Sequence, residues 1–171
     1  MGSAKETVIR NFKGVIRGTD FVLQAIPSDK LNHKLDSKGT KLRDIAFHIA
    51  TLPLGATIFA KGVFEKFPSV PVLMEAFDEY LGEMMKSNDY AAIFRKSCEV
   101  FLDHYNQFSD EEFVNSTYSN FLTGGPITHL GGFLGTQNHV VHHRGTLFGF
   151  LRSLEIPVSM HQYFGMNPLE M

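Results

Sequence analysis

Two histidines in the last third of the chain have the spacing of a pair of metal ligands. His139 and His143 are separated by four residues, which is one helical turn, or about 6 Å along the axis. Two imidazole rings so placed can converge on one ion at metal–nitrogen distances of about 2.0–2.1 Å. Two buried imidazoles without a metal would each need a separate hydrogen-bond partner, and the neighbouring sequence offers few. A metal site is the hypothesis; ordinary core or surface histidines are the alternative.

A metal ion needs at least one further ligand from elsewhere in the chain, and His48 is the best candidate. It lies beside Ile45 and Ile49, which belong to the apolar stripe of another helical segment. That position places it at the edge of a bundle interior, and helical bundles build metal sites from ligands that project inward from facing helices. We therefore predict that His48, His139 and His143 bind one divalent metal ion. The other histidines are predicted to be ordinary surface or loop residues: His33, His104, His129 and His161.

Three neighbours of these histidines are weaker candidates for a role. His142 lies about 60° around the helix from His139, so we predict that it and Arg144 support the site without ligating the ion, or that His142 contacts another helix. Asp44 lies one turn before His48 and could orient its ring or accept a proton as the weak candidate for a catalytic residue. The alternative for Asp44 is an exposed acid that stabilises the start of a helix.

Long helical segments must position these side chains. Apolar residues recur at intervals of three and four over residues 5–26, 41–63, 87–108 and 124–155, which is the helical period. Pro53 interrupts the second segment and predicts a kink there. A short helix is expected over residues 72–86, a loop over 28–40, and a turn or short helix over 109–120.

These elements predict a fold class. No strand alternation of useful length is found, so we expect an all-α protein, a four-helix bundle in one domain covering residues 1–171. It has one long connection between the second and third helices. The fourth segment is also apolar at Leu134, Val141 and Phe148, away from the histidines. A helix apolar on several sides is buried or forms a subunit interface, and a homodimer is therefore predicted.

Composition excludes several classes of function. The net charge is −2, and the chain lacks the basic stripe that nucleic-acid binding needs. It has no apolar run long enough for a transmembrane helix and no signal peptide, so a cytoplasmic protein that does not bind membranes is expected. Cys98 is the only cysteine, which excludes an internal disulfide; it is predicted to be a buried, unreactive residue. Zincin, P-loop, nucleophile-elbow and dinucleotide motifs are absent.

Two segments carry a resemblance to a known family. Residues 138–147, NHVVHHRGTL, resemble the signature of the DinB-like (DinB/YfiT-like) metalloprotein superfamily, in which His-His-Arg-Gly-Gln-Leu closely follows another His. Residues 42–49, LRDIAFHI, are similar to that family's second-helix motif, which supplies the first histidine. The resemblance covers the order of helices along most of the chain.

The resemblance implies a four-helix bundle in up-down-down-up order, with zinc or nickel held by His48, His139 and His143. Thr146 stands where the family usually has Gln, which weakens inference about the substrate. The family's activities are mixed: some relatives transfer or isomerise substrates with the help of a low-molecular-weight thiol, and many have no assigned activity.

Three protein ligands leave a coordination position open, which is typical of catalytic sites. A water there could ionise near neutral pH, or a thiol could be held as its thiolate. We therefore expect a small-molecule substrate, with a low-molecular-weight thiol as a candidate, and a metal-dependent transferase or hydrolase. The alternative is a non-catalytic metal- or ligand-binding or stress-response protein whose metal is structural. Protons should compete with the metal below a pH of about 6–6.5.

Overall fold

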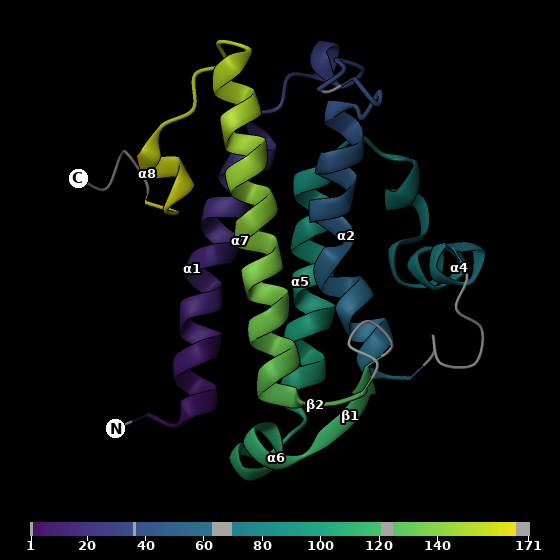
Figure 1. Ribbon diagram of the computed structural model, residues 1–171, viewed down its shortest axis with the longest axis vertical. Helices are drawn as coiled ribbons and strands as arrows, with labels where there is room; N and C mark the ends of the chain where they lie inside the picture. The colour runs from purple at the N-terminus through teal and green to yellow at the C-terminus, as the bar shows by residue number, and fades with distance from the viewer. Residues whose placement is uncertain (1, 36, 63–69, 121–124, 167–171) are drawn as a thin grey trace.

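The computed structural model is mostly helical, and four long helices dominate it. These are α1 (Ala4–Gln24), α2 (Leu42–Ala60), α5 (Tyr90–Asn106) and α7 (His129–Ser153). They lie side by side, with α2 and α7 toward the viewer (Figure 1). Helix α1 packs against α5 and α7, and α2 packs against the same two helices. All four correspond to the predicted helical segments.

The structure describes residues 2–35, 37–62, 70–120 and 125–166. The predicted end of the second segment at Val63 and the predicted start of the fourth at Gly124 lie outside these residues. Within them, α2 continues through Pro53, and the predicted kink stays a prediction. None of the helices in the described ranges is long and apolar enough to cross a bilayer.

Short elements connect the long helices. Helix α4 (Val70–Leu81) is followed by the 3₁₀ turn η2 (Gly82–Lys86), in agreement with the short helix predicted for this region. The connection between α1 and α2 contains the 3₁₀ turn η1 (Ser28–Lys30). After α5 comes α6 (Asp110–Asn115), and α8 (Met160–Tyr163), which was not predicted, follows α7.

A small hairpin contradicts the prediction that the protein has no strands. Strand β1 (Thr117–Asn120) pairs antiparallel with β2 (Gly125–Thr128), and Thr117 lies opposite Thr128. Each strand has four residues, too few for alternation to be recognised against the surrounding turn residues. Pro126, which lies within the predicted fourth segment, is exposed in β2, where a two-stranded ribbon tolerates a residue without a donor.

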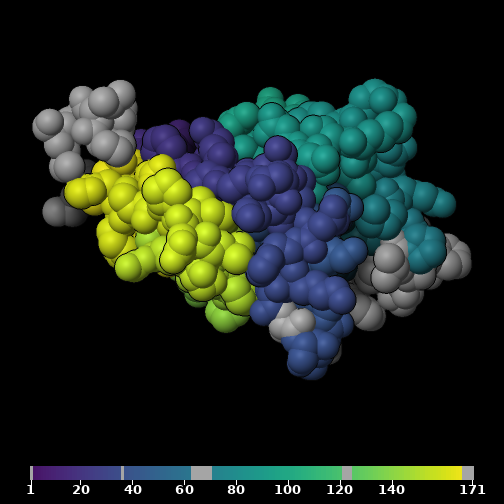
Figure 2. Space-filling model, turned by 90° about the horizontal axis from the view of Figure 1, so that it is seen from above, coloured from purple at the N-terminus to yellow at the C-terminus, as the bar shows by residue number. Residues whose placement is uncertain are grey.

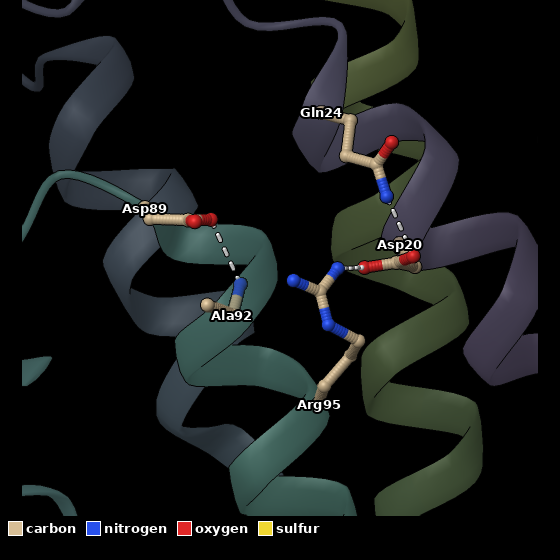
Figure 3. A network of polar contacts seen from close by, with 5 residues as sticks. All are labelled: Asp20, Gln24, Asp89, Ala92 and Arg95. Atoms are coloured by element: carbon tan, nitrogen blue, oxygen red, sulfur yellow. Dashed lines mark hydrogen bonds and ion pairs between the residues drawn. The ribbon is translucent and has the colours of Figure 1, made fainter.

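Local capping fixes where the helices begin, and one polar network joins α1 to α5. The carboxylate of Asp89 accepts a hydrogen bond from the Ala92 N–H at 2.9 Å and so caps the start of α5. Nearby, Arg95 of α5 forms a 2.6 Å ion pair with Asp20 of α1, and Gln24 donates to the other oxygen of that carboxylate (Figure 3). Exposed pairs of this kind contribute only about 0–1 kcal/mol, so packing holds the helices together.

The packing is aromatic at the centre. Phe12 of α1, Phe101 of α5 and Phe133 of α7 are fully buried, and their ring centroids are 5.1–5.3 Å apart. Pairs at such separations contribute about 0.5–1.5 kcal/mol beyond their buried area. Cys98 is buried as predicted, and that burial raises the pKa of its thiol well above the ordinary range. The centre of the protein is therefore occupied by hydrocarbon.

The face of α7 that prompted the homodimer prediction is partly covered by the chain's own C-terminal segment. Phe148 is buried, with its ring 5.1 Å from that of Tyr163 in α8. A Cβ at Gly18 of α1 would overlap the Tyr163 carbonyl, so only glycine admits this close approach. Seen from above, the yellow C-terminal segment borders the blue α1–α2 connection (Figure 2). The homodimer stays a prediction.

Candidate metal centre

The three predicted ligands come together between two neighbouring helices. His48 lies in the first half of α2, while His139 and His143 lie on successive turns of α7. Helices α2 and α7 pack side by side (Figure 1). The ring centroid of His48 is 5.3 Å from that of His139 and 4.5 Å from that of His143. One nitrogen from each ring lies within 4.8 Å of the other two, so these side chains could hold a metal ion.

The nitrogen positions suit a divalent ion. The Nε2 atoms of His139 and His143 are 2.9 Å apart. Two metal–nitrogen bonds of about 2.0–2.1 Å at a right angle place their nitrogens about 2.9 Å apart. The same 2.9 Å separation also allows a hydrogen bond between the two rings when one of these nitrogens carries a proton, whereas the buried Nδ1 of His143 has no hydrogen-bond partner among the described residues. The donor set, three imidazoles, is one that zinc and nickel accept.

Electrostatics keep these rings neutral. Burial lowers the pKa of His143 to about 4, helped by the neighbouring charges of His48, His139 and His142. Partial burial, then the charge of His139, lowers the pKa of His48, and burial likewise lowers that of His139. Because neutral imidazole is the metal-binding form, the rings are ready to bind at neutral pH. Competition by protons should then begin below the ordinary histidine pKa of about 6.5.

The site is more open than predicted. His48 and His139 are exposed and His143 is half-buried, whereas the sequence suggested that His139 and His143 face the bundle interior and that His48 lies at its edge. The interior is filled by the aromatic core around Phe12 and Phe133, which leaves the histidines at the edge where α2 and α7 meet solvent. An ion bound there would keep positions accessible to a further ligand.

A cavity of about 460 Å³ adjoins the histidines. His48 and His139 form part of its wall, and the remaining described lining comes from α2, α4, α7 and the hairpin. This volume lies within the range of small-molecule sites, about 300–1,000 Å³. The cavity thus places room for an organic ligand next to the three imidazoles.

The weaker candidates are placed differently. The carboxylate of Asp44 accepts a hydrogen bond from the Lys41 N–H at 2.7 Å, which accounts for it as a cap of α2. His142 is exposed, and its ring centroid is 4.9 Å from that of His143, which fits a supporting neighbour. The Thr146 hydroxyl donates to the His142 carbonyl at 3.2 Å, so its described hydrogen bond stays within α7.

Arg144 does not support the site through any described contact. Its side chain is buried, donates to the Val15 carbonyl at 3.3 Å and lies over the Tyr163 ring at 4.3 Å. These partners belong to α1 and α8, on another side of α7 from the histidines. One residue along a helix turns the side chain through about 100°, which directs Arg144 away from His143, and its supporting role stays a prediction.

Two histidines predicted to lie on the surface are buried together. His104 and His129 are 8% and 6% exposed. The ring of His129 stacks between Phe108, at 3.9 Å, and Tyr118, at 5.3 Å. Burial, then the charges of Lys61 and His129, lowers the pKa of His104 to about 4. His104 follows Phe101 by three residues and thus shares the buried face of its helix, a signal available in the sequence. His129 precedes Phe133 by four residues and carries the same kind of signal.

Comparison with known proteins gives the fold. No family model and no curated protein matches this sequence. Solved structures do match. A DinB-like protein from Bacillus cereus ATCC 10987 superimposes with a TM-score of 0.66 at 18% identity, over 90% of this chain and 96% of that one. The protein has a DinB-like fold.

Two further structures agree. A DinB-family protein from Exiguobacterium sibiricum 255-15 gives a TM-score of 0.63 at 17% identity, over 95% of this chain and 99% of that one. A DinB-like protein from Bacillus subtilis gives 0.63 at 17% identity, over 89% and 96%. At such identities the likeness describes the DinB-like fold alone, and the chemistry of this chain must be argued from its own residues.

Proposed function

We propose that this DinB-like protein binds one divalent metal ion through His48, His139 and His143 and uses it to activate a small-molecule substrate. The observation that carries the proposal is the convergence of three imidazole nitrogens within 4.8 Å beside a 460 Å³ cavity that His48 and His139 line. Zinc or nickel is the proposed ion, because both accept nitrogen ligands.

The proposed reaction class is transfer of a thiol group to an electrophile, or hydrolysis. A bound divalent ion would supply Lewis-acid chemistry, polarising a substrate atom or lowering the pKa of a water or thiol that it coordinates. The chain's own part is to hold the ion with neutral rings and to orient the substrate in the cavity. The partners proposed are a small molecule and a low-molecular-weight thiol.

The proposed topology is the up-down-down-up four-helix bundle. It is supported by the packing of α1 and α2 against both α5 and α7 and by the DinB-like fold. In this topology the second and fourth helices, which carry the ligands, are neighbours.

The first test is metal content and activity together. Protein loaded with zinc or nickel should hold about one ion per chain and turn over a member of a panel of thiols with 1-chloro-2,4-dinitrobenzene, or a p-nitrophenyl ester. Chelation should abolish turnover, and the same ion should restore it. Protein that binds no metal under any loading condition would overturn the proposal.

The second candidate is a non-catalytic protein whose metal is structural. Structural sites are closed by four protein ligands, whereas two of these three histidines are exposed, which favours the catalytic proposal. Thermal melts with and without chelator separate the two. A large loss of stability on chelation, with no turnover of any thiol or ester, would favour the structural alternative.

A further inference from the structure

The cavity beside the histidines runs from the metal ligands toward the hairpin. On α2 its wall extends from His48 to Phe59, and on α7 from His139 back to Gly131. These stretches cover about 16 Å and 12 Å of helix at 1.5 Å per residue. Tyr118 and Ile127 of the hairpin complete the far end. One end of the cavity can therefore coordinate a ligand through a metal ion, and the rest encloses it with mostly apolar side chains, with Tyr118 and Asn120 as polar neighbours at the hairpin.

The wall of this cavity carries no charged side chain among the described residues that line it. Two of its polar groups are satisfied within their own helices: the Thr51 hydroxyl donates to the Phe47 carbonyl at 2.9 Å, and the Thr136 hydroxyl donates to the Gly132 carbonyl at 2.9 Å. The hydrogens of these two hydroxyls are therefore already donated within α2 and α7. A charged group placed there would lose its hydration without gaining an ion pair.

Small residues on α2 and α7 leave the space that the cavity occupies. Gly55 and Ala56 on α2 and Gly132 and Gly135 on α7 line the cavity. Gly132 cannot be enlarged, because a Cβ would overlap the Tyr118 hydroxyl. Gly135 differs, since an added Cβ would meet nothing within 4 Å. A longer side chain at position 135 would therefore project into open space at the cavity without displacing its neighbours.

We propose that the substrate is an uncharged amphiphile. It has a metal-coordinating donor such as a thiol at one end, placed at His48 and His139, and an apolar alkyl or aryl body lying between α2 and α7 toward the hairpin. The proposal rests on the proposed function and adds the substrate class. The cavity wall alone determines the preference for the apolar body, so it applies with or without the metal.

Calorimetric titration of zinc-loaded protein with n-alkanethiols from butane- to octanethiol tests the proposal. Affinity should rise roughly three- to fourfold with each added methylene until the cavity is filled. The matching ω-mercaptocarboxylates, which keep the thiol and end in a charge, should bind at least about tenfold more weakly than the alkanethiols of equal length. Equal or tighter binding of the carboxylates, or no dependence on chain length, would overturn the proposal.

Two glycine variants of α7 localise the effect. Gly135→Leu should remove the dependence on chain length while keeping bound zinc. Gly149→Leu is the matched control, because Gly149 is also exposed, lies in the same helix and has open space at its Cβ. Circular dichroism confirms that both are folded. Retention of the chain-length dependence in Gly135→Leu would place the apolar body elsewhere and contradict the proposal.

A metal-free arm separates this inference from the proposed function. The n-alkanols cannot replace the thiol as a strong zinc ligand, so their binding to chelator-treated protein reports the cavity alone. Length-dependent binding there, lost in Gly135→Leu, supports the apolar cavity even if no metal binds. Absence of length-dependent alkanol binding in metal-free protein that is otherwise folded counts against the cavity itself.

Discussion

Helix α7 contributes histidines to two regions of opposite character. Near its middle, His139 and His143 join His48 in the open triad, where three rings converge at the surface beside a cavity. At its first residue, His129 joins His104 in the sealed cluster, which we define as His104, Tyr105, Phe108, Tyr118 and His129. Histidines are therefore candidate metal ligands in the open triad and buried packing residues in the sealed cluster, and the difference comes from the side chains around them.

The difference lies in what surrounds each imidazole. In the sealed cluster, two buried ring nitrogens have no hydrogen-bond partner among the described residues: His104 Nε2 and His129 Nδ1. Aromatic rings fill the space around them, and these nitrogens do not converge with a third ligand. In the open triad, nitrogens face one another and a ligand can approach. Low pKa values alone therefore do not identify a metal site; convergence and access do.

The largest expected effect comes from removing one ligand of the open triad. In His139→Ala, two imidazoles remain, and metal affinity should fall by more than about 100-fold, beyond the loss typical of supporting residues. Metal competition against a chromophoric chelator measures it. His129→Gln is the control on the same helix and should leave affinity unchanged. An equal loss of metal affinity in both variants would show that the open triad and the sealed cluster do not differ in metal binding.

Opening the sealed cluster should reduce stability without affecting the metal. Phe108 is half-buried and stacks on His129, so Phe108→Ala should lower the free energy of unfolding by about 2 kcal/mol, less than for a fully buried Phe. Once exposed, the His129 ring should also have a pKa closer to the ordinary histidine value, because burial is the main cause of its lowered pKa. Urea denaturation and NMR titration of the imidazole measure these changes. An unchanged His129 pKa would show that Phe108 does not seal the cluster.

A smaller effect should appear in how the free energy of unfolding depends on pH. His104 has a pKa of about 4 in the folded protein and about 6.5 when unfolded, so the unfolded state binds more protons between these values. The contribution of neutral His104 to the free energy of unfolding is complete above pH 6.5. It is lost as pH falls toward 4, at about 1.4 kcal/mol per pH unit. In chelator-treated protein, the free energy of unfolding of His104→Phe should therefore depend less steeply on pH between 4 and 6.5, by about 1.4 kcal/mol per pH unit.

The matched control for this measurement is His161→Phe, since His161 is exposed. Its slope should equal that of the unmodified protein. A His104→Phe slope identical to both would mean that His104 is protonated equally in the folded and unfolded states.

The smallest expected effect is at the border of the open triad. His142→Gln should change metal affinity by less than about threefold, because His142 is exposed and its described ring contact is an edge-to-face one with His143. The same chelator competition measures it. A loss as large as that of His139→Ala would make His142 a ligand and enlarge the triad to four.

Local sequence determined the helices and one face of the site. The spacing of His139 and His143 fixes their rings on one side of a helix whatever the rest of the chain does, because the helical repeat is a local property. The periodic segments likewise located the long helices to within a few residues. The buried position of His104 was also encoded, three residues after Phe101.

Tertiary structure decided what local patterns could not. Whether His48 reaches the pair on α7 depends on how two helices distant in sequence pack, and the exposure of the triad depends on where the aromatic core fills the interior. The sealing of His129 requires Phe108 and Tyr118 from separate elements, and the cavity exists because four elements leave space beside the histidines. Periodicity assigns faces to helices, but only the packed chain assigns each face its neighbours.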